Sequence, residues 1–325
     1  MTDTILDIRD LSIGLYDGHA PAMAVEGVNF SIGRGEVFGL VGESGCGKSL
    51  CALALAGLLK PPMAAAGGQI LLEGRDLVGC SQQEMRGLRG NKISMIFQEP
   101  MTALNPLMTV GDQIGEMFVL HRGLGAHAAR MKAIEALEQV QVSSPERRVS
   151  AYPHQLSGGM RQRVMIAIAL ACDPALLIAD EPTTALDVTI QAEIVELVLE
   201  LCRAKGTAVM MISHDLGLIA RICNRVAVMY AGQIVEERGA TEIFTAPAHP
   251  YTCGLVDALP RLGRRLEHGQ KPLTEIGGVV PAIRDFPQAC RFAPRCPRAT
   301  AECRAAPIPM IELAEGGRVR CLHHV

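Results

Sequence analysis

The sequence GESGCGKS, residues 42–49, matches the pattern G-x-x-x-x-G-K-[ST] at every fixed position. Glycines in such a loop let backbone N–H groups turn inward around phosphate oxygens, and the helix that follows presents its positive N-terminal end. Lys48 adds a charge for the β- and γ-phosphates, and the Ser49 hydroxyl is a ligand for Mg²⁺. We therefore predict that the whole loop binds a nucleotide through Gly42, Glu43, Ser44, Gly45, Cys46, Gly47, Lys48 and Ser49.

A second stretch with chemical meaning lies far along the chain, where the apolar run at residues 176–179 ends in Asp180 and Glu181. Asp180 at the tip of such a strand can hold Mg²⁺, directly or through water. Glu181, one residue further, can polarise the water that attacks the γ-phosphorus. Apolar strands often end in acids, so the pair gains meaning only together with the phosphate loop.

The pattern of apolar residues predicts strands that alternate with helices, which implies a largely parallel sheet with helices on both faces. The expected strands are residues 25–31, 36–41, 92–97, 175–179 and 207–212, with a hairpin formed by 226–230 and 233–237. The expected helices are 49–59, 160–171 and 190–201, and the pattern between Gln98 and about Tyr152 is also helical. Thr109 and Asp112 are placed to open one helix of that region. After about Pro247 periodicity fades, so we predict a domain boundary there.

Composition limits the classes of function. The chain has 325 residues, a net charge of −3, 3% aromatic residues and no Trp, which argues against a nucleic-acid partner. No signal peptide is visible at the first ten residues. The apolar runs reach about half of the roughly 20 residues that a membrane span requires, so we expect any link to a membrane to go through a partner.

Residues 156–163 read LSGGMRQR, and here the chain resembles the ATPase subunits of ABC transporters, whose signature is an LSGG segment at the start of a helix. Further motifs of that family follow in the right order. Gln98 ends a strand as in the Q-loop, Asp187 closes the ALD sequence of the D-loop, and His214 follows an apolar strand like the switch histidine. Tyr16 is the expected aromatic that stacks on adenine.

The resemblance implies a P-loop (RecA-like) α/β core with an antiparallel β subdomain, an inserted helical subdomain near residues 99–155 and a small Cys-rich C-terminal domain. The expected domains are residues 1–247 and 248–325. ATP would be held by one subunit and closed on by the Ser157, Gly158 and Gly159 segment of the opposite subunit. His214 would contact the γ-phosphate and orient the water with Glu181, while Asp187 would couple the two sites. Gln98 would sense the nucleotide, and Ser49, Gln98 and Asp180 would surround Mg²⁺.

Three stretches are similar to the importers of dipeptides, oligopeptides and nickel: QEPMTALNP at residues 98–106, Met160 after the signature glycines, and AHPYT at 248–252. Met160 is typical of one of the two ATPase subunits in this branch. The implied reaction is ATP + H₂O → ADP + phosphate, driving solute uptake at the cytoplasmic face of the inner membrane. The implied partners are a second, related but different ATPase subunit, two transmembrane permeases and, indirectly, an extracytoplasmic solute-binding protein.

Two alternatives stay open. A soluble ABC ATPase without a transport role is one, although this chain has neither two ATPase units nor a long coiled coil. An importer of a nickel complex or another small solute is the other, because nothing in this subunit is expected to touch the solute.

The tail contains four cysteines, Cys290, Cys296, Cys303 and Cys321, without a C-x₂₋₄-C pair and among several arginines. Structural zinc sites usually contain such a pair, and disulfides are disfavoured in a reducing compartment. Four thiolates near cations suit a [4Fe–4S] cluster, and the resemblance to peptide-importer ATPases supports one. We therefore predict an iron–sulfur cluster, with zinc and free thiols as the alternatives. His323 and His324 are close enough in sequence to be alternative ligands.

Overall fold

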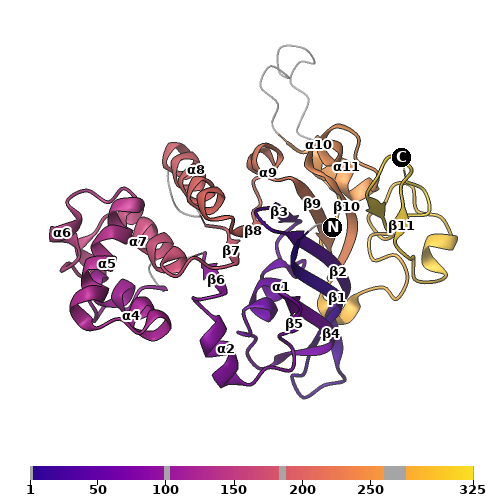
Figure 1. Ribbon diagram of the computed structural model, residues 1–325. Helices are drawn as coiled ribbons and strands as arrows, with labels where there is room; N and C mark the ends of the chain where they lie inside the picture. Colours follow the sequence, from indigo (N-terminus) through magenta and orange to yellow (C-terminus); the bar gives the residue numbers. More distant parts are fainter. Residues whose placement is uncertain (1–2, 99–102, 183–187, 260–275, 325) are drawn as a thin grey trace, which may run out of the picture. The chain divides into compact units, whose positions relative to one another are not determined.

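The computed structural model describes residues 3–98, 103–182, 188–259 and 276–324 (Figure 1). The chain divides into two compact units. Unit 1 comprises residues 1–6, 31–36 and 71–211, and unit 2 comprises residues 7–30, 37–70 and 212–325. Within the described ranges, no helix combines the length and the apolar character needed to cross a bilayer.

Unit 2 holds the phosphate loop between strand β3 (Val37–Val41) and helix α1 (Lys48–Leu55). All five residues of β3 are buried, as expected for a strand covered on both faces. β3 pairs in parallel with β9 (Arg225–Tyr230), and β9 pairs antiparallel with β10 (Gln233–Gly239). Ala231 and Gly232 have φ angles of 45° and 83°, the left-handed pair that a tight hairpin turn needs, so the predicted hairpin is confirmed.

A second sheet lies mostly in unit 2, where its strands follow the order β2-β1-β4. These are β1 (Thr4–Leu15), β2 (Ala22–Gly33) and β4 (Met63–Leu72). The sequence pattern indicated only the middle of β2. β1 and β4 were missed, because Asp and Gly residues interrupt their apolar alternation.

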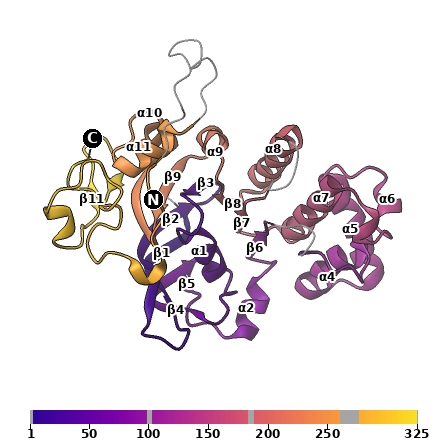
Figure 2. The same ribbon diagram turned by 180° about the vertical axis from the view of Figure 1, so that it is seen from behind.

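The C-terminal part of the chain from residue 248 onward, the tail, continues the β9–β10 ribbon, as both views show (Figures 1 and 2). Strand β12 (Arg318–Val319) pairs antiparallel with β10 and with β11 (Ile311–Glu312), giving the order β11-β12-β10-β9-β3 within unit 2. The remaining elements of this unit are short: α9 (Leu216–Ile222), α10 (Ala240–Thr245), α11 (Pro250–Asp257) and the 3₁₀ turns η2 (Ile283–Asp285) and η3 (Glu302–Arg304).

Unit 1 contains three buried strands in the order β8-β7-β6. These are β6 (Ile93–Ile96), β7 (Leu176–Asp180) and β8 (Ala208–Ile212), and β6 and β7 run parallel. Their runs match three strands of the sequence prediction. At the edge of this unit, β5 (Arg75–Asp76) forms an antiparallel pair with the end of β4, and α2 (Gln82–Leu88) begins with a capping box of Ser81 and Glu84.

Helices occupy most of the chain between β6 and β7, as the sequence predicted. They are α4 (Val110–Arg122), α5 (Ala126–Gln139), α6 (Pro145–Arg148), the 3₁₀ turn η1 (Pro153–Gln155) and α7 (Gly158–Leu170), followed after β7 by α8 (Val188–Lys205). Thr109 caps α4, since its Oγ1 accepts from the Asp112 N–H at 3.1 Å. α4, α5, α6 and α7 lie side by side in both views (Figures 1 and 2).

Candidate functional site

The phosphate loop has a backbone that only glycine can adopt at its first position. Gly42 has φ +150°, and a Cβ there would lie 2.1 Å from the carbonyl oxygen of Met229. Gly47, with φ +108°, would meet the Met229 methyl at 2.8 Å. Gly45 also has a positive φ, but a Cβ there would point into open space. The loop is thus pressed against β9 on one side and open on the other.

Lys48 is 6% exposed although it carries a charge. Its Nζ donates to the carbonyl oxygens of Gly42 at 2.7 Å and Glu43 at 3.0 Å, and it lies 3.6 Å from the Cys46 sulfur. Burial raises the pKa of the Cys46 thiol, so this sulfur is neutral and is no nucleophile at neutral pH.

The exposed face of the loop is formed by Ser44, Gly45 and Ser49. This face adjoins the N-terminus of α1, where backbone N–H groups favour an anion. A buried lysine behind an exposed backbone cradle fits a polyphosphate, and the Ser49 hydroxyl is the oxygen ligand that Mg²⁺ prefers.

Unit 1 brings Gln98 and Glu181 together. Gln98 follows β6 and Glu181 follows β7, and the Gln98 amide donates to the Glu181 carboxylate at 2.9 Å. Glu181 has φ +47°, a left-handed conformation that costs about 1–3 kcal/mol in a non-glycine residue. Asp180, at the tip of β7, is 6% exposed. Two carboxylates with different exposure at one strand end are suited to different tasks, one for a cation and one for a water.

Gln162 on α7 is a further residue of this region that sequence reasoning missed. It is 1% exposed, and its amide donates to the carbonyl oxygen of Pro182, directly after Glu181. The signature helix is therefore tied to the strand end that carries the two carboxylates. The sequence offered one signal for this role: Gln162 is a polar residue on the apolar face of the helix predicted at residues 160–171.

The signature segment forms the start of α7. Ser157 is its N-cap, with Oγ accepting from the Met160 N–H at 3.3 Å, and Gly158 and Gly159 make the first turn. Ser157 and Gly158 are exposed. The segment thus presents a helix N-terminus outward, as contact with an anion on another molecule requires.

The remaining predicted residues are placed as follows. His214 is exposed and lies between β8 and α9, in unit 2. Tyr16 follows directly after β1, is 46% exposed and donates its N–H to the Pro62 carbonyl at 2.8 Å. Asp187 lies outside the described residues, as does the segment 99–102.

The tail contacts the phosphate loop, which nothing in the sequence indicated. The Glu43 N–H donates to the Tyr251 hydroxyl at 2.9 Å. The Glu43 carboxylate accepts from Arg295 at 2.7 and 3.1 Å. Behind these contacts, Tyr230, Tyr251 and Phe292 form an aromatic cluster with ring centroids 4.7–5.4 Å apart.

The predicted iron–sulfur cluster is wrong. The described part of the chain, which includes all four tail cysteines, contains no group of three or more His, Cys, Asp or Glu residues that could hold a metal ion. This finding also speaks against zinc, and all four thiols are free. In the chain without a bound metal, burial raises the pKa of Cys290 and Cys296, and that of Cys321 to about 11, so these thiols are protonated at neutral pH.

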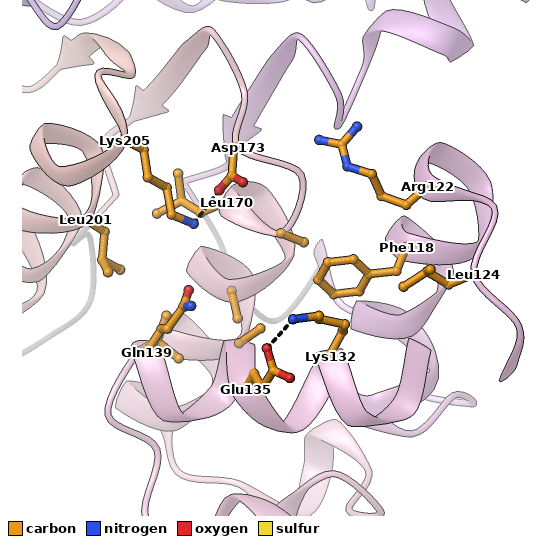
Figure 3. Close-up of a pocket in the computed structure, with 14 residues that line it drawn as sticks. Phe118, Arg122, Leu124, Lys132, Glu135, Gln139, Leu170, Asp173, Leu201 and Lys205 are labelled. Carbon is orange, nitrogen blue, oxygen red and sulfur yellow. Dashed lines mark hydrogen bonds and ion pairs between the residues drawn. The ribbon is translucent and has the colours of Figure 1, made fainter. Parts of the chain in front are cut away.

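A cavity of about 340 Å³ in unit 1 lies among α4, α5, α7 and α8 (Figure 3). Figure 3 shows Phe118 at its wall, with the pair Lys132 and Glu135 on one side and Lys205 and Asp173 on another. Both cations are paired with carboxylates at 2.5 Å, and no residue of the phosphate loop lines the cavity. None of the residues predicted to bind the nucleotide lines this cavity.

Comparisons with known proteins agree with this geometry. The family model described as ABC transporter matches residues 25–184, and the model described as oligopeptide/dipeptide transporter, C-terminal region, matches residues 235–303. The chain is 50% identical over 322 residues to a probable peptide ABC transporter ATP-binding protein, y4tR, of Sinorhizobium fredii, covering 98% of this chain and 95% of that protein. It is 48% identical over 317 residues to the dipeptide transport ATP-binding protein DppD of Escherichia coli, covering 98% and 96%.

A solved structure is also similar. It is the dimer of an ATP-binding cassette in a post-hydrolysis state, bound to ADP and phosphate. The match has a TM-score of 0.65 and 27% sequence identity, and it covers 72% of this chain and 98% of the other.

Proposed function

Because this chain belongs to the ABC transporter family of ATP-binding subunits, we propose that it hydrolyses ATP to power the uptake of dipeptides or oligopeptides. The family and the ATPase fold account for ATP and Mg²⁺ use. The peptide substrate is inferred from the relatives, whose names specify peptide and dipeptide transport.

The observation that carries the proposal is the pairing of Gln98 with Glu181 at the end of β7, one residue beyond Asp180. A carboxylate held by an amide is a suitable base for a water molecule. In the proposed reaction Glu181 polarises the attacking water, and His214 contacts the γ-phosphate and orients that water. Lys48 and the loop backbone hold the phosphates. Ser49, Gln98 and Asp180 would surround Mg²⁺, which neutralises charge on the β- and γ-phosphates.

We propose that two such subunits form the complete site. The exposed helix start at Ser157, Gly158 and Gly159 would close on the γ-phosphate held by the opposite subunit, and Asp187 would couple the two sites. Tyr16 is the proposed adenine contact, and its exposed side chain, directly after β1, supports that role. The solved dimer of a similar cassette supports pairing of this kind.

The finer architecture is part of the same proposal. Residues 1–247 would form the ATPase domain, with a RecA-like core, an antiparallel β subdomain and a helical subdomain at about 99–155. Residues 248–325 would form the C-terminal domain. The helical subdomain would contact two permeases at the cytoplasmic face of the membrane, and the second ATPase would be a related but different chain.

Replacing Glu181 with Gln tests the chemistry. Glu181→Gln should keep ATP binding but lower steady-state hydrolysis at least about a hundredfold, the scale of one general base. Glu200→Gln on the exposed face of α8 makes the same chemical change away from the site and should keep full activity. Near-normal turnover by Glu181→Gln would remove this residue from its proposed role. Transport is tested by reconstituting the chain with its permeases and measuring ATP-dependent uptake of a labelled dipeptide.

A further inference from the structure

Two residues of the tail, Arg295 and Tyr251, both bind one residue of the phosphate loop, Glu43. We propose that Arg295 is a positioning residue for ATP binding, which holds the phosphate loop in its binding conformation through Glu43. The proposal rests on nucleotide binding by the loop and assigns a task to the C-terminal region within unit 2.

Arg295 is held on every nitrogen of its guanidinium. Nη1 and Nη2 donate to the two carboxylate oxygens of Glu43, at 2.7 and 3.1 Å. Nε donates to the Gly277 carbonyl at 2.8 Å and Nη2 to the Ile276 carbonyl at 3.0 Å. The side chain of Arg295 is 5% exposed, against 29% for Glu43. A two-point ion pair of this kind fixes orientation as well as distance, which a lysine in the same place cannot do.

The aromatic cluster keeps the arginine in place. Its guanidinium carbon lies 5.6 Å from the Tyr230 ring centroid and 6.0 Å from that of Phe292. The hydrogen bond to Glu43 raises the pKa of Arg295, so the charge is permanent. A charged group that is buried, stacked and fully bonded has one orientation, and it transmits that orientation to its partner.

Glu43 is connected to the phosphate-binding lysine by its own main chain. Its carbonyl oxygen accepts from Lys48 Nζ at 3.0 Å, while its N–H is bound by the Tyr251 hydroxyl at 2.9 Å. Tyr251 therefore binds the N–H of Glu43, while Lys48 binds the carbonyl oxygens of Glu43 and of the preceding Gly42. When the Arg295 bond is lost, the Glu43 side chain is released and the carbonyl that orients Lys48 gains freedom.

A second tail arginine holds another element close in sequence to a proposed nucleotide contact. Arg284 donates to the Asp17 carboxylate and to the Ala20 carbonyl, the latter at 2.8 Å. Asp17 is the residue after Tyr16, the proposed adenine contact. Two arginines of the tail, Arg284 and Arg295, thus bind segments that carry proposed ATP contacts. If the two arginines only anchored the tail to the rest of unit 2, they would not need to bind these particular segments.

The test uses the full chain and compares Arg295→Ala with Arg298→Ala, which removes an exposed arginine three residues away. The measured quantities are the dissociation constant for a fluorescent ATP analogue and, separately, KM and kcat for ATP hydrolysis. Arg295→Ala should weaken ATP binding at least about tenfold, the scale of one lost hydrogen bond to a charged group. The value of kcat at saturating ATP should stay within about twofold. Arg298→Ala should match the wild type.

A double-variant comparison separates positioning from general destabilisation. If Arg295 acts through Glu43, Glu43→Ala with Arg295→Ala should bind ATP no more weakly than Arg295→Ala alone. Arg295→Lys keeps the charge but loses the two-point contact, so it should restore only part of the affinity. If Arg295→Ala does not fold, Arg295→Lys and Glu43→Gln supply the same comparison with smaller changes.

The inference is overturned if Arg295→Ala, or Arg295→Lys where the alanine variant fails to fold, binds ATP within twofold of the wild type. Additive losses in the double variant would also overturn it, because Arg295 would then act without Glu43. Lys48→Ala distinguishes this outcome from failure of the proposed function: if Lys48→Ala retains ATP affinity, the loop is not the nucleotide site at all. If only Lys48→Ala loses affinity, the function stands and the role of Arg295 falls.

Discussion

Lowering the pH should destabilise unit 2 through His249. This residue is 2% exposed, and burial lowers its pKa to about 3. Its Nδ1 accepts from the Tyr251 N–H at 3.0 Å, so protonation removes the acceptor that caps α11. In the unfolded chain the imidazole has an ordinary pKa of about 6.5 and takes up a proton freely below that pH.

The size and sign of the effect follow from proton linkage. Between pH 6.5 and pH 3 the unfolded state binds one more proton than the folded state, so stability rises with pH at up to about 1.4 kcal/mol per unit. The full contribution is present above pH 6.5 and is lost progressively below it. Between pH 7.5 and pH 5.0, His249 should lower the free energy of unfolding by about 2 kcal/mol.

Urea unfolding followed by far-UV circular dichroism at pH 5.0, 5.5, 6.0, 6.5 and 7.5 measures this slope. His249→Asn is the matched variant, because its amide oxygen can replace Nδ1 as the acceptor for the Tyr251 N–H without titrating in this range. The slope of the wild type between pH 5.0 and 6.5 should exceed that of the variant by about 1 kcal/mol per pH unit. Equal slopes would show that His249 is not buried and neutral in the folded protein, and the reasoning would fail.

Two further predictions concern the candidate site. Gly42→Ala should abolish ATP binding, because its Cβ would lie 2.1 Å from the Met229 carbonyl oxygen. The Cβ of Gly45→Ala would lie in open space, so this variant should lose only about 1–2 kcal/mol of stability, the cost of a left-handed backbone in alanine. Fluorescent ATP titration and thermal unfolding of both variants check this, and equal ATP affinity in the two would contradict it. Gln98→Ala removes the donor to the Glu181 carboxylate and should lower kcat about tenfold, measured by steady-state hydrolysis at saturating ATP and Mg²⁺. An unaltered kcat would mean that the bond has no part in the reaction.

Much of the fold was readable from local patterns. The phosphate loop, the strand that ends in Asp180, and the hairpin at Ala231 and Gly232 each depend on residues within ten positions of one another. A glycine with a positive φ or a run of buried apolar residues leaves its mark in the sequence wherever the rest of the chain lies. β1 and β4 were missed because their alternation is weak and only their neighbours in the sheet stabilise them as strands.

The tail cysteines show the opposite case. The spacing of Cys290, Cys296, Cys303 and Cys321 suggested a cluster. All four residues line one pocket in the folded chain, but the described residues contain no group of three or more His, Cys, Asp or Glu that could hold a metal ion. In the folded chain Cys321 accepts a hydrogen bond from the His323 N–H at 3.3 Å, and Cys303 lies 3.5 Å from the Thr300 hydroxyl. Burial, which no local pattern reveals, decides that Cys290, Cys296 and Cys321 are neutral thiols.

The sequence by itself was enough to recognise the family and to predict the phosphate loop and the residues that we assign to ATP hydrolysis, because each of these lies in a short motif. Only the tertiary structure decided that Arg295 and Tyr251 hold Glu43, and that Gln98 reaches Glu181 and Gln162 reaches Pro182. Arg295 and Glu43 are 252 positions apart. A charged or polar group that packing buries must find a hydrogen-bonding partner nearby, and which partner is near depends on the folded chain and not on a local motif.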